Sequence, residues 1–115
     1  MTTVYVMNLA WEDQTGETPG KEARVLMVPK NPDDPCKILP LDMRLDLRNH
    51  SPTGFSWGYR GSGPAQLGLA ICAHVLQDDA RAVLVYPMLV DRVISRQPSS
   101  RWAITREAVL EAIGL

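Results

Sequence analysis

The side chains that could move protons or bind a metal are few and widely spaced. His50, His74, Cys36 and Cys72 are the candidate bases, nucleophiles and zinc ligands. A base at His50 could serve a small hydrolase or transferase, but no acid or nucleophile stands at a diagnostic distance from it. The separations of the cysteines and histidines also differ from the close pairs that bind zinc. We therefore expect a non-enzymatic protein with no catalytic residue, no metal and no cofactor.

A glycine-rich turn is the strongest candidate for an anion site. Residues 58–66 read G-Y-R-G-S-G-P-A-Q, so Arg60, Gly61, Ser62 and Gly63 stand just before an expected helix. Consecutive N–H groups at the N-terminus of a helix can bind a phosphate. The spacing lacks the Lys-Ser/Thr of a P-loop and the third glycine of a dinucleotide motif, so a purely structural turn is the competing interpretation.

Two arginines near the C-terminus extend this candidate. Arg92 and Arg96 stand four residues apart in a locally basic segment of a chain whose net charge is −1. On a helix they would share a face and could contact phosphates or an acidic protein surface. Together with the glycine turn they define an alternative function, the binding of nucleic acid or of a nucleotide phosphate.

The first third of the chain is acidic and holds a candidate surface for binding a protein. Its residues are Trp11, Glu12, Asp13 and Glu17, in an expected N-terminal hairpin. Carboxylates beside a tryptophan could mimic phosphate charge against a basic groove of a partner.

Short β-strands should position these residues. Residues 3–10 are apolar on both faces, as in an interior strand, and residues 21–28 should pair with them antiparallel across a turn-rich loop. Residues 36–41 and 43–47 could form short strands around Pro40. Residues 55–59 place Phe55, Trp57 and Tyr59 at every second position, which predicts a third strand with its rings in the core. Exposed rings at these positions would instead stack on single-stranded bases.

Helices should follow these strands. Gly63 as N-cap and Pro64 as first residue predict a helix to about Gln77 that is apolar almost all round, and therefore buried with His74 as a core residue.

Two more helices are expected toward the C-terminus. Asp78 and Asp79 are N-cap candidates for a helix over residues 80–94, which Pro87 should kink or break. The side chains of this helix that should pack inward are Val83, Leu84, Tyr86, Val90, Val93 and Ile94. Residues 101–104 suit a closing strand, and Thr105 should cap a terminal helix over residues 106–113, with Ala108, Val109, Ala112 and Ile113 facing inward.

These elements predict one α+β domain over residues 1–115. A small antiparallel sheet, made of the N-terminal hairpin and the strand at residues 55–59, should pack on the buried helix. Residues 1–50 should form its variable, β-rich part, and residues 51–115 should supply the signature strand, the turn and the helices. The apolar stretches are shorter than the roughly 20 residues of a membrane helix. The N-terminus does not resemble a secretory signal, and two cysteines are too few for a disulfide scaffold, so we expect a cytoplasmic protein.

The stretch S-P-T-G-F-S-W-G-Y-R-G-S-G-P-A-Q-L-G-L-A, residues 51–70, resembles the signature of a family of small bacterial and phage domains of unknown function. The resemblance is densest over residues 51–73 and thinner through Tyr86, Val93 and residues 102–104. It implies an accessory protein of a phage or another mobile element. On this basis the leading hypothesis is a protein-interaction module that modulates or inhibits a host protein complex, with anti-defence activity such as anti-CRISPR as one form.

Overall fold

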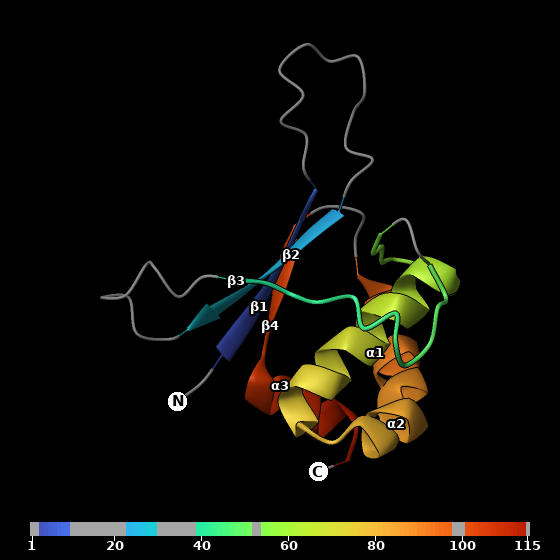
Figure 1. The fold of residues 1–115 in the computed structure, drawn as a ribbon. Helices are drawn as coiled ribbons and strands as arrows, with labels where there is room; N and C mark the ends of the chain where they lie inside the picture. Colours follow the sequence, from blue (N-terminus) through green and yellow to red (C-terminus); the bar gives the residue numbers. More distant parts are fainter. Residues whose placement is uncertain (1–2, 10–22, 30–38, 52–53, 98–100, 115) are drawn as a thin grey trace.

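The fold is a small α+β arrangement with helices on one side of an antiparallel sheet (Figure 1). The structure, a computed structural model, describes residues 3–9, 23–29, 39–51, 54–97 and 101–114. The candidate protein-binding residues Trp11, Glu12, Asp13 and Glu17, and also Cys36, lie outside these ranges. The α+β class predicted from the sequence is confirmed.

The sheet is built around the N-terminal strand. Its order is β3 (Leu39–Pro40), β2 (Ala23–Pro29), β1 (Thr3–Leu9), β4 (Trp102–Thr105), with every pair antiparallel. Tyr5 stands opposite Met27 of β2 on one side and Ile104 of β4 on the other. Tyr5 and Met7 are fully buried, so alternate side chains of β1 enter the core. The predicted antiparallel pairing of the first two strands is confirmed.

Helix α1 (Ser62–Leu76) is the centre of the domain, and most of its residues are buried. It begins slightly earlier than predicted, with Gly61 rather than Gly63 as N-cap, and ends at Gln77 in the left-handed conformation. Gly68 brings α1 close to the next helix. A Cβ atom there would lie 2.6 Å from Cγ2 of Val90, so no larger residue fits without a shift.

Helix α2 (Asp79–Arg92) is continuous through Pro87. Of the two predicted alternatives, a kinked helix or one broken at Pro87, the break is therefore wrong. The helix ends at Arg92, slightly earlier than predicted, and a short 3-10 turn, η2 (Ile94–Arg96), follows. The predicted N-cap Asp78 is confirmed, since its side chain accepts the N–H of Arg81 at 3.1 Å. Pro87 is exposed, so its ring meets solvent rather than the core.

Helix α3 (Arg106–Ala112) follows β4 directly. The predicted cap Thr105 is confirmed, because its hydroxyl accepts the N–H of Ala108 at 3.1 Å. Val109 and Ile113 are buried as predicted, whereas Ala108 is exposed.

The predicted strand at residues 55–59 is wrong. Phe55 makes an isolated bridge, and the segment is not one of the strands of the described sheet. Gly58 has a φ of 88° and donates its N–H to the carbonyl of Ile94, which turns the chain away from an extended course. Phe55 and Trp57 are buried but Tyr59 is 52% exposed, so the three rings do not share one face.

The two short strands predicted around Pro40 are confirmed only in part. Leu39 and Pro40 form β3 at the sheet edge, and residues 36–38 lie outside the described ranges. Residues 45–47 are a turn, closed by the N–H of Leu47 on the carbonyl of Arg44, rather than a strand.

Candidate functional site

The outer face of α2 carries Leu84, the most exposed large apolar side chain among the described residues, so the prediction that Leu84 packs inward is wrong. Leu84 is 77% exposed, and Pro87 and Met88 lie three and four residues further on, so the three side chains share one helical face. A shallow groove lies beside this face. It is lined by Arg60, Ala65, Tyr86, Pro87, Val90 and Asp91. We call Leu84, Pro87, Met88 and this groove the α2 surface.

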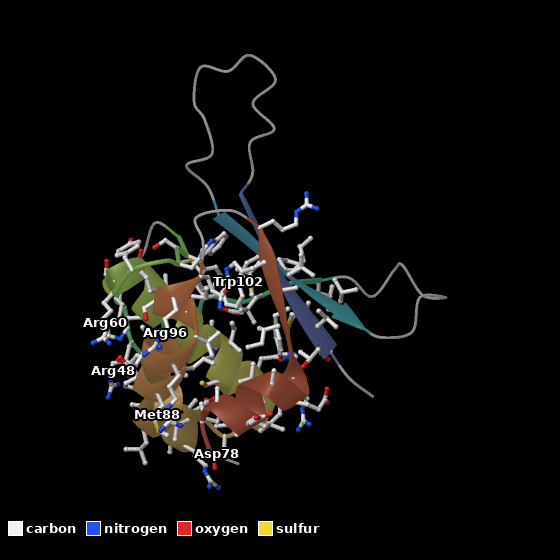
Figure 2. All side chains as sticks on the ribbon, turned by 180° about the vertical axis from the view of Figure 1, so that it is seen from behind. Arg48, Arg60, Asp78, Met88, Arg96 and Trp102 are labelled. Atoms are coloured by element: carbon white, nitrogen blue, oxygen red, sulfur yellow. The ribbon has the colours of Figure 1, made fainter. Side chains whose placement is uncertain are left out.

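Arginines surround the C-terminal half of the α2 surface. The guanidinium of Arg60 pairs with the carboxylate of Asp91, and Nε of Arg96 donates to the carbonyl of Asp91 at 3.1 Å. The structure therefore brings Arg60 and Arg96 to one place. Figure 2 shows Arg48 on the same side of the molecule. Arg92 points elsewhere, because it donates to the carbonyl of Ala112, the last residue of α3, at 2.8 Å.

The glycine turn has a structural use at its second half. A Cβ atom on Gly63 would lie 1.9 Å from Oγ of Ser56, so glycine is required where the turn packs on residues 55–57. Ser62 is exposed and begins α1, whose N-cap Gly61 offers no side-chain bond. Arg60, the charged member of this candidate anion site, is held by Asp91.

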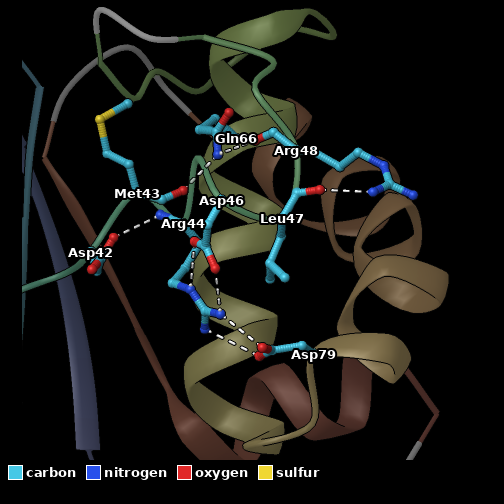
Figure 3. Close-up of polar contacts among 8 residues, drawn as sticks. All are labelled: Asp42, Met43, Arg44, Asp46, Leu47, Arg48, Gln66 and Asp79. Atoms are coloured by element: carbon cyan, nitrogen blue, oxygen red, sulfur yellow. Dashed lines mark hydrogen bonds and ion pairs between the residues drawn. The ribbon is translucent and has the colours of Figure 1, made fainter.

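His50 is tied to both long helices. Its ring atom Nε2 lies 2.8 Å from the hydroxyl of Tyr86 on α2. Its backbone N–H donates to Oε1 of Gln66 on α1. Gln66 is fully buried and also accepts the N–H of Ser51. Its amide nitrogen donates to the carbonyls of Met43 and Arg48 (Figure 3). These bonds fix the loop that carries His50, so the histidine acts here as a structural anchor.

The second histidine pairs with a buried tyrosine. Nδ1 of His74 lies 2.6 Å from the hydroxyl of Tyr5, and burial lowers the pKa of His74 while it raises that of Tyr5. Both groups are therefore neutral at pH 7. Burial also raises the pKa of the Cys72 thiol to about 12, so this cysteine is protonated and a poor nucleophile. Within the described ranges, no three His, Cys, Asp or Glu side chains are grouped to hold a metal ion.

A second hollow, which the sequence did not reveal, lies between the sheet edge and the C-terminal half of α1. Its volume is about 260 Å³. It is lined by Met27, Pro40, Leu41, Asp42, Arg44, Ala70, Ala73, His74, Gln77 and Asp79. We call it the Asp42 cavity.

Arg44 organises the rim of the Asp42 cavity. Its guanidinium makes paired hydrogen bonds to both carboxylate oxygens of Asp46 and of Asp79, at 2.8 to 3.1 Å (Figure 3). These bonds raise the pKa of Arg44 and lower that of Asp46. The N–H of Arg44 donates to Asp42 at 2.8 Å, which holds the backbone at a φ of 54°. The alternation D-M-R-L-D at residues 42–46 was a local signal for this network, but its partner Asp79 is 35 residues away.

These features define a small α+β domain in which His50 and the buried Gln66 hold a loop in place and His74 joins α1 to β1. The chain belongs to a family of unknown function, DUF6166, whose model matches residues 21–114. The match extends beyond the segment of residues 51–73 and includes β2 and β3. No curated protein and no solved structure matches the chain. Among the described residues, no helix is long and apolar enough to cross a membrane.

Proposed function

We propose that this protein is a non-enzymatic interaction module whose α2 surface binds an acidic partner protein. The observation that carries the proposal is the exposure of Leu84, at 77%, in a helix whose opposite side is anchored in the core by Ala82 and Leu89. Exposed apolar side chains that adjoin one another on a helix commonly mark a protein contact. Pro87 and Met88 extend this apolar face, and the groove beside it could receive a side chain of the partner.

The charge around this face favours an acidic partner. Three exposed arginines lie on this side of the molecule, against the carboxylate of Asp91. They are Arg48, Arg60 and Arg96. An apolar centre with a basic rim is complementary to a partner surface with apolar side chains and carboxylates.

The family resemblance suggests the setting of this interaction. In this proposal the protein is an accessory factor of a phage or mobile element, and its partner belongs to a host complex that it modulates or inhibits, with anti-CRISPR activity as one form. Trp11, Glu12, Asp13 and Glu17 remain proposed as a second contact, toward a basic groove of that complex.

A capture experiment with matched variants tests the α2 surface. The tagged protein and its Leu84→Glu variant are incubated with host lysate after nuclease treatment, and bound proteins are identified by mass spectrometry. The control, Leu39→Glu, places the same charge on an exposed leucine of β3. We expect a stoichiometric partner to be retained by the wild type and by Leu39→Glu and lost by Leu84→Glu. Equal retention by all three proteins would refute this placement.

Binding of nucleic acid or of a nucleotide phosphate is the second candidate function. The convergence of Arg60 and Arg96 beside the glycine turn favours it. Against it, these guanidinium groups already contact Asp91. A phosphate ligand would have to compete for Arg60. The candidate predicts an affinity that falls steeply with salt and is weakened by Arg60→Gln and Arg96→Gln. Binding of an oligonucleotide that is insensitive to salt, or no binding, would remove it.

A further inference from the structure

The Asp42 cavity combines an apolar floor with a polar rim. Met27 and Leu41 come from the sheet side, and Ala70 and Ala73 come from α1. Its volume of about 260 Å³ is slightly below the roughly 300 Å³ at which pockets for small molecules begin, so it suits one extended side chain or a short aliphatic ligand.

The rim of the cavity has a negative charge. Asp42 and Asp79 stand on it, and Arg44 is the positively charged residue of the lining. The positive charge of Arg44 is neutralised locally, because its guanidinium pairs with the carboxylates of Asp46 and Asp79. The carboxylates Asp42, Asp46 and Asp79 therefore exceed the one guanidinium by two charges.

The backbone contributes opposite partial charges at the cavity. Helix α1 ends there, with Gln77 as its C-cap and His74 in its last turn, and helix α2 begins there at Asp79. The C-terminal end of a helix carries partial negative charge and the N-terminal end partial positive charge, so the carboxylates set the sign of the potential. Burial lowers the pKa of His74, so this side chain does not oppose them with a positive charge at neutral pH.

From the cavity and its charges we infer that the Asp42 cavity binds an alkylammonium group, with the aliphatic chain on the apolar floor and the ammonium at Asp42 and Asp79. A lysine side chain of a protein and a free aliphatic amine both have this chemistry. Oδ1 of Asp42 accepts the N–H of Arg44, which leaves Oδ2 to accept from the ammonium. The cavity and the α2 surface share no lining residue, so this site can be tested without any partner of α2.

The test compares ligands that differ only in charge. The ¹⁵N-labelled protein is titrated with Nα-acetyl-lysine methylamide, with its uncharged norleucine counterpart and with 1,5-diaminopentane, and the amide shifts of Ala73, His74 and Gln77 are followed by NMR. We expect saturable shifts with at least one amine, and an affinity about three-fold or more above that of the norleucine compound, the size of one exposed ion pair. Tighter binding of the lysine compound assigns the site to a protein side chain, and tighter binding of the diamine assigns it to a free amine.

A variant of Asp42 separates charge from structure. Asp42→Asn keeps an oxygen that can accept the N–H of Arg44, and should weaken amine binding about three-fold while the melting temperature stays close to that of the wild type. The control Glu111→Gln removes one exposed carboxylate from α3 and should leave the affinity unchanged. Equal binding of the norleucine compound, an equal loss in both variants, or no shift at the α1 amides would overturn the inference.

Discussion

The hydroxyl of Tyr5 lies 2.6 Å from Nδ1 of His74 and joins the interior strand β1 to helix α1 across 69 positions of sequence. Their rings meet edge to face, with centroids 5.6 Å apart. This contact connects the two layers of the fold, and it sets how stability should respond to pH.

Acid should weaken the fold through His74. Burial lowers its pKa below the ordinary 6.5, so below pH 6.5 the unfolded chain binds a proton that the folded chain does not. The contribution of His74 to the free energy of unfolding is therefore present above pH 6.5 and lost as the pH falls. Urea denaturation should show that the free energy of unfolding falls between pH 7.5 and pH 5.5, and that it falls less in the His74→Gln variant than in the wild type. An identical decrease in both proteins would show that His74 does not titrate in this way.

Tyr5→Phe should remove the hydrogen bond without emptying the core. We expect the free energy of unfolding at pH 7.5 to fall by about 1 kcal/mol, the usual net value of such a bond. Burial raises the pKa of Tyr5, so the tyrosine also stabilises the fold below pH 10.0 and loses this effect as the pH rises above it. The variant should lack that alkaline loss. A phenylalanine variant as stable as the wild type both at pH 7.5 and above pH 10.0 would contradict this role.

Gln66→Met should be among the most damaging substitutions of similar size. It would leave the N–H groups of His50 and Ser51 and the carbonyls of Met43 and Arg48 without their partner. Unpaired buried groups cost about 1–3 kcal/mol each, and water will recover some of them, so we expect a loss of about 3 kcal/mol in urea denaturation. Gln97→Met, which removes one bond to Val93, should cost less than about 1 kcal/mol. Similar losses for the two variants would argue against a central role for Gln66.

Gly68→Ala should force α1 and α2 apart. The added methyl would lie 2.6 Å from Cγ2 of Val90 and 3.3 Å from the carbonyl oxygen of Tyr86. Overpacking of this kind costs about 1–3 kcal/mol, more than the gain in helix propensity. Val90→Ala should relieve part of the loss in the double variant. If the two losses simply add, the proposed contact is not the cause.

Pro87→Ala should stabilise α2. Alanine restores the backbone N–H that can donate to the carbonyl four residues earlier. In isolated helices, an interior proline costs about 3 kcal/mol relative to alanine. Because the fold already accommodates the ring, we expect a gain of about 1 kcal/mol, seen as a higher melting temperature. Ala103, exposed on β4, can be changed to serine as a neutral control. A lower melting temperature for Pro87→Ala would show that the ring itself contributes packing.

Local signals allowed much of the fold to be predicted. Asp78 and Thr105 were identified as caps because a cap depends on residues two or three positions away. The burial of α1 followed from its uniformly apolar sequence. The alternating rings of residues 55–59 misled, because Gly58 adopts a positive φ that an aromatic pattern does not reveal.

The features that could not be predicted from the sequence depend on contacts between residues far apart in the chain. The bonds from Arg44 to Asp79 and from Gln66 to Met43 span 35 and 23 positions, and no spacing rule predicts such pairs. The exposed side of α2 was predicted wrongly, with Leu84 facing inward, because Leu84 and Leu89 differ in the sequence only by position but are 77% and 0% exposed. Neither the α2 surface nor the Asp42 cavity could be assembled from the sequence.

The position of β4 beside β1 has a consequence for synthesis of the protein. Val4 faces Thr105, so the first strand to leave the ribosome acquires its second neighbour only after about a hundred further residues have been translated. At roughly 5–20 residues per second, β1 waits several seconds with one edge unpaired. An unpaired edge can recruit strands of other chains, so nascent protein should depend on chaperones more than the small size of the domain suggests.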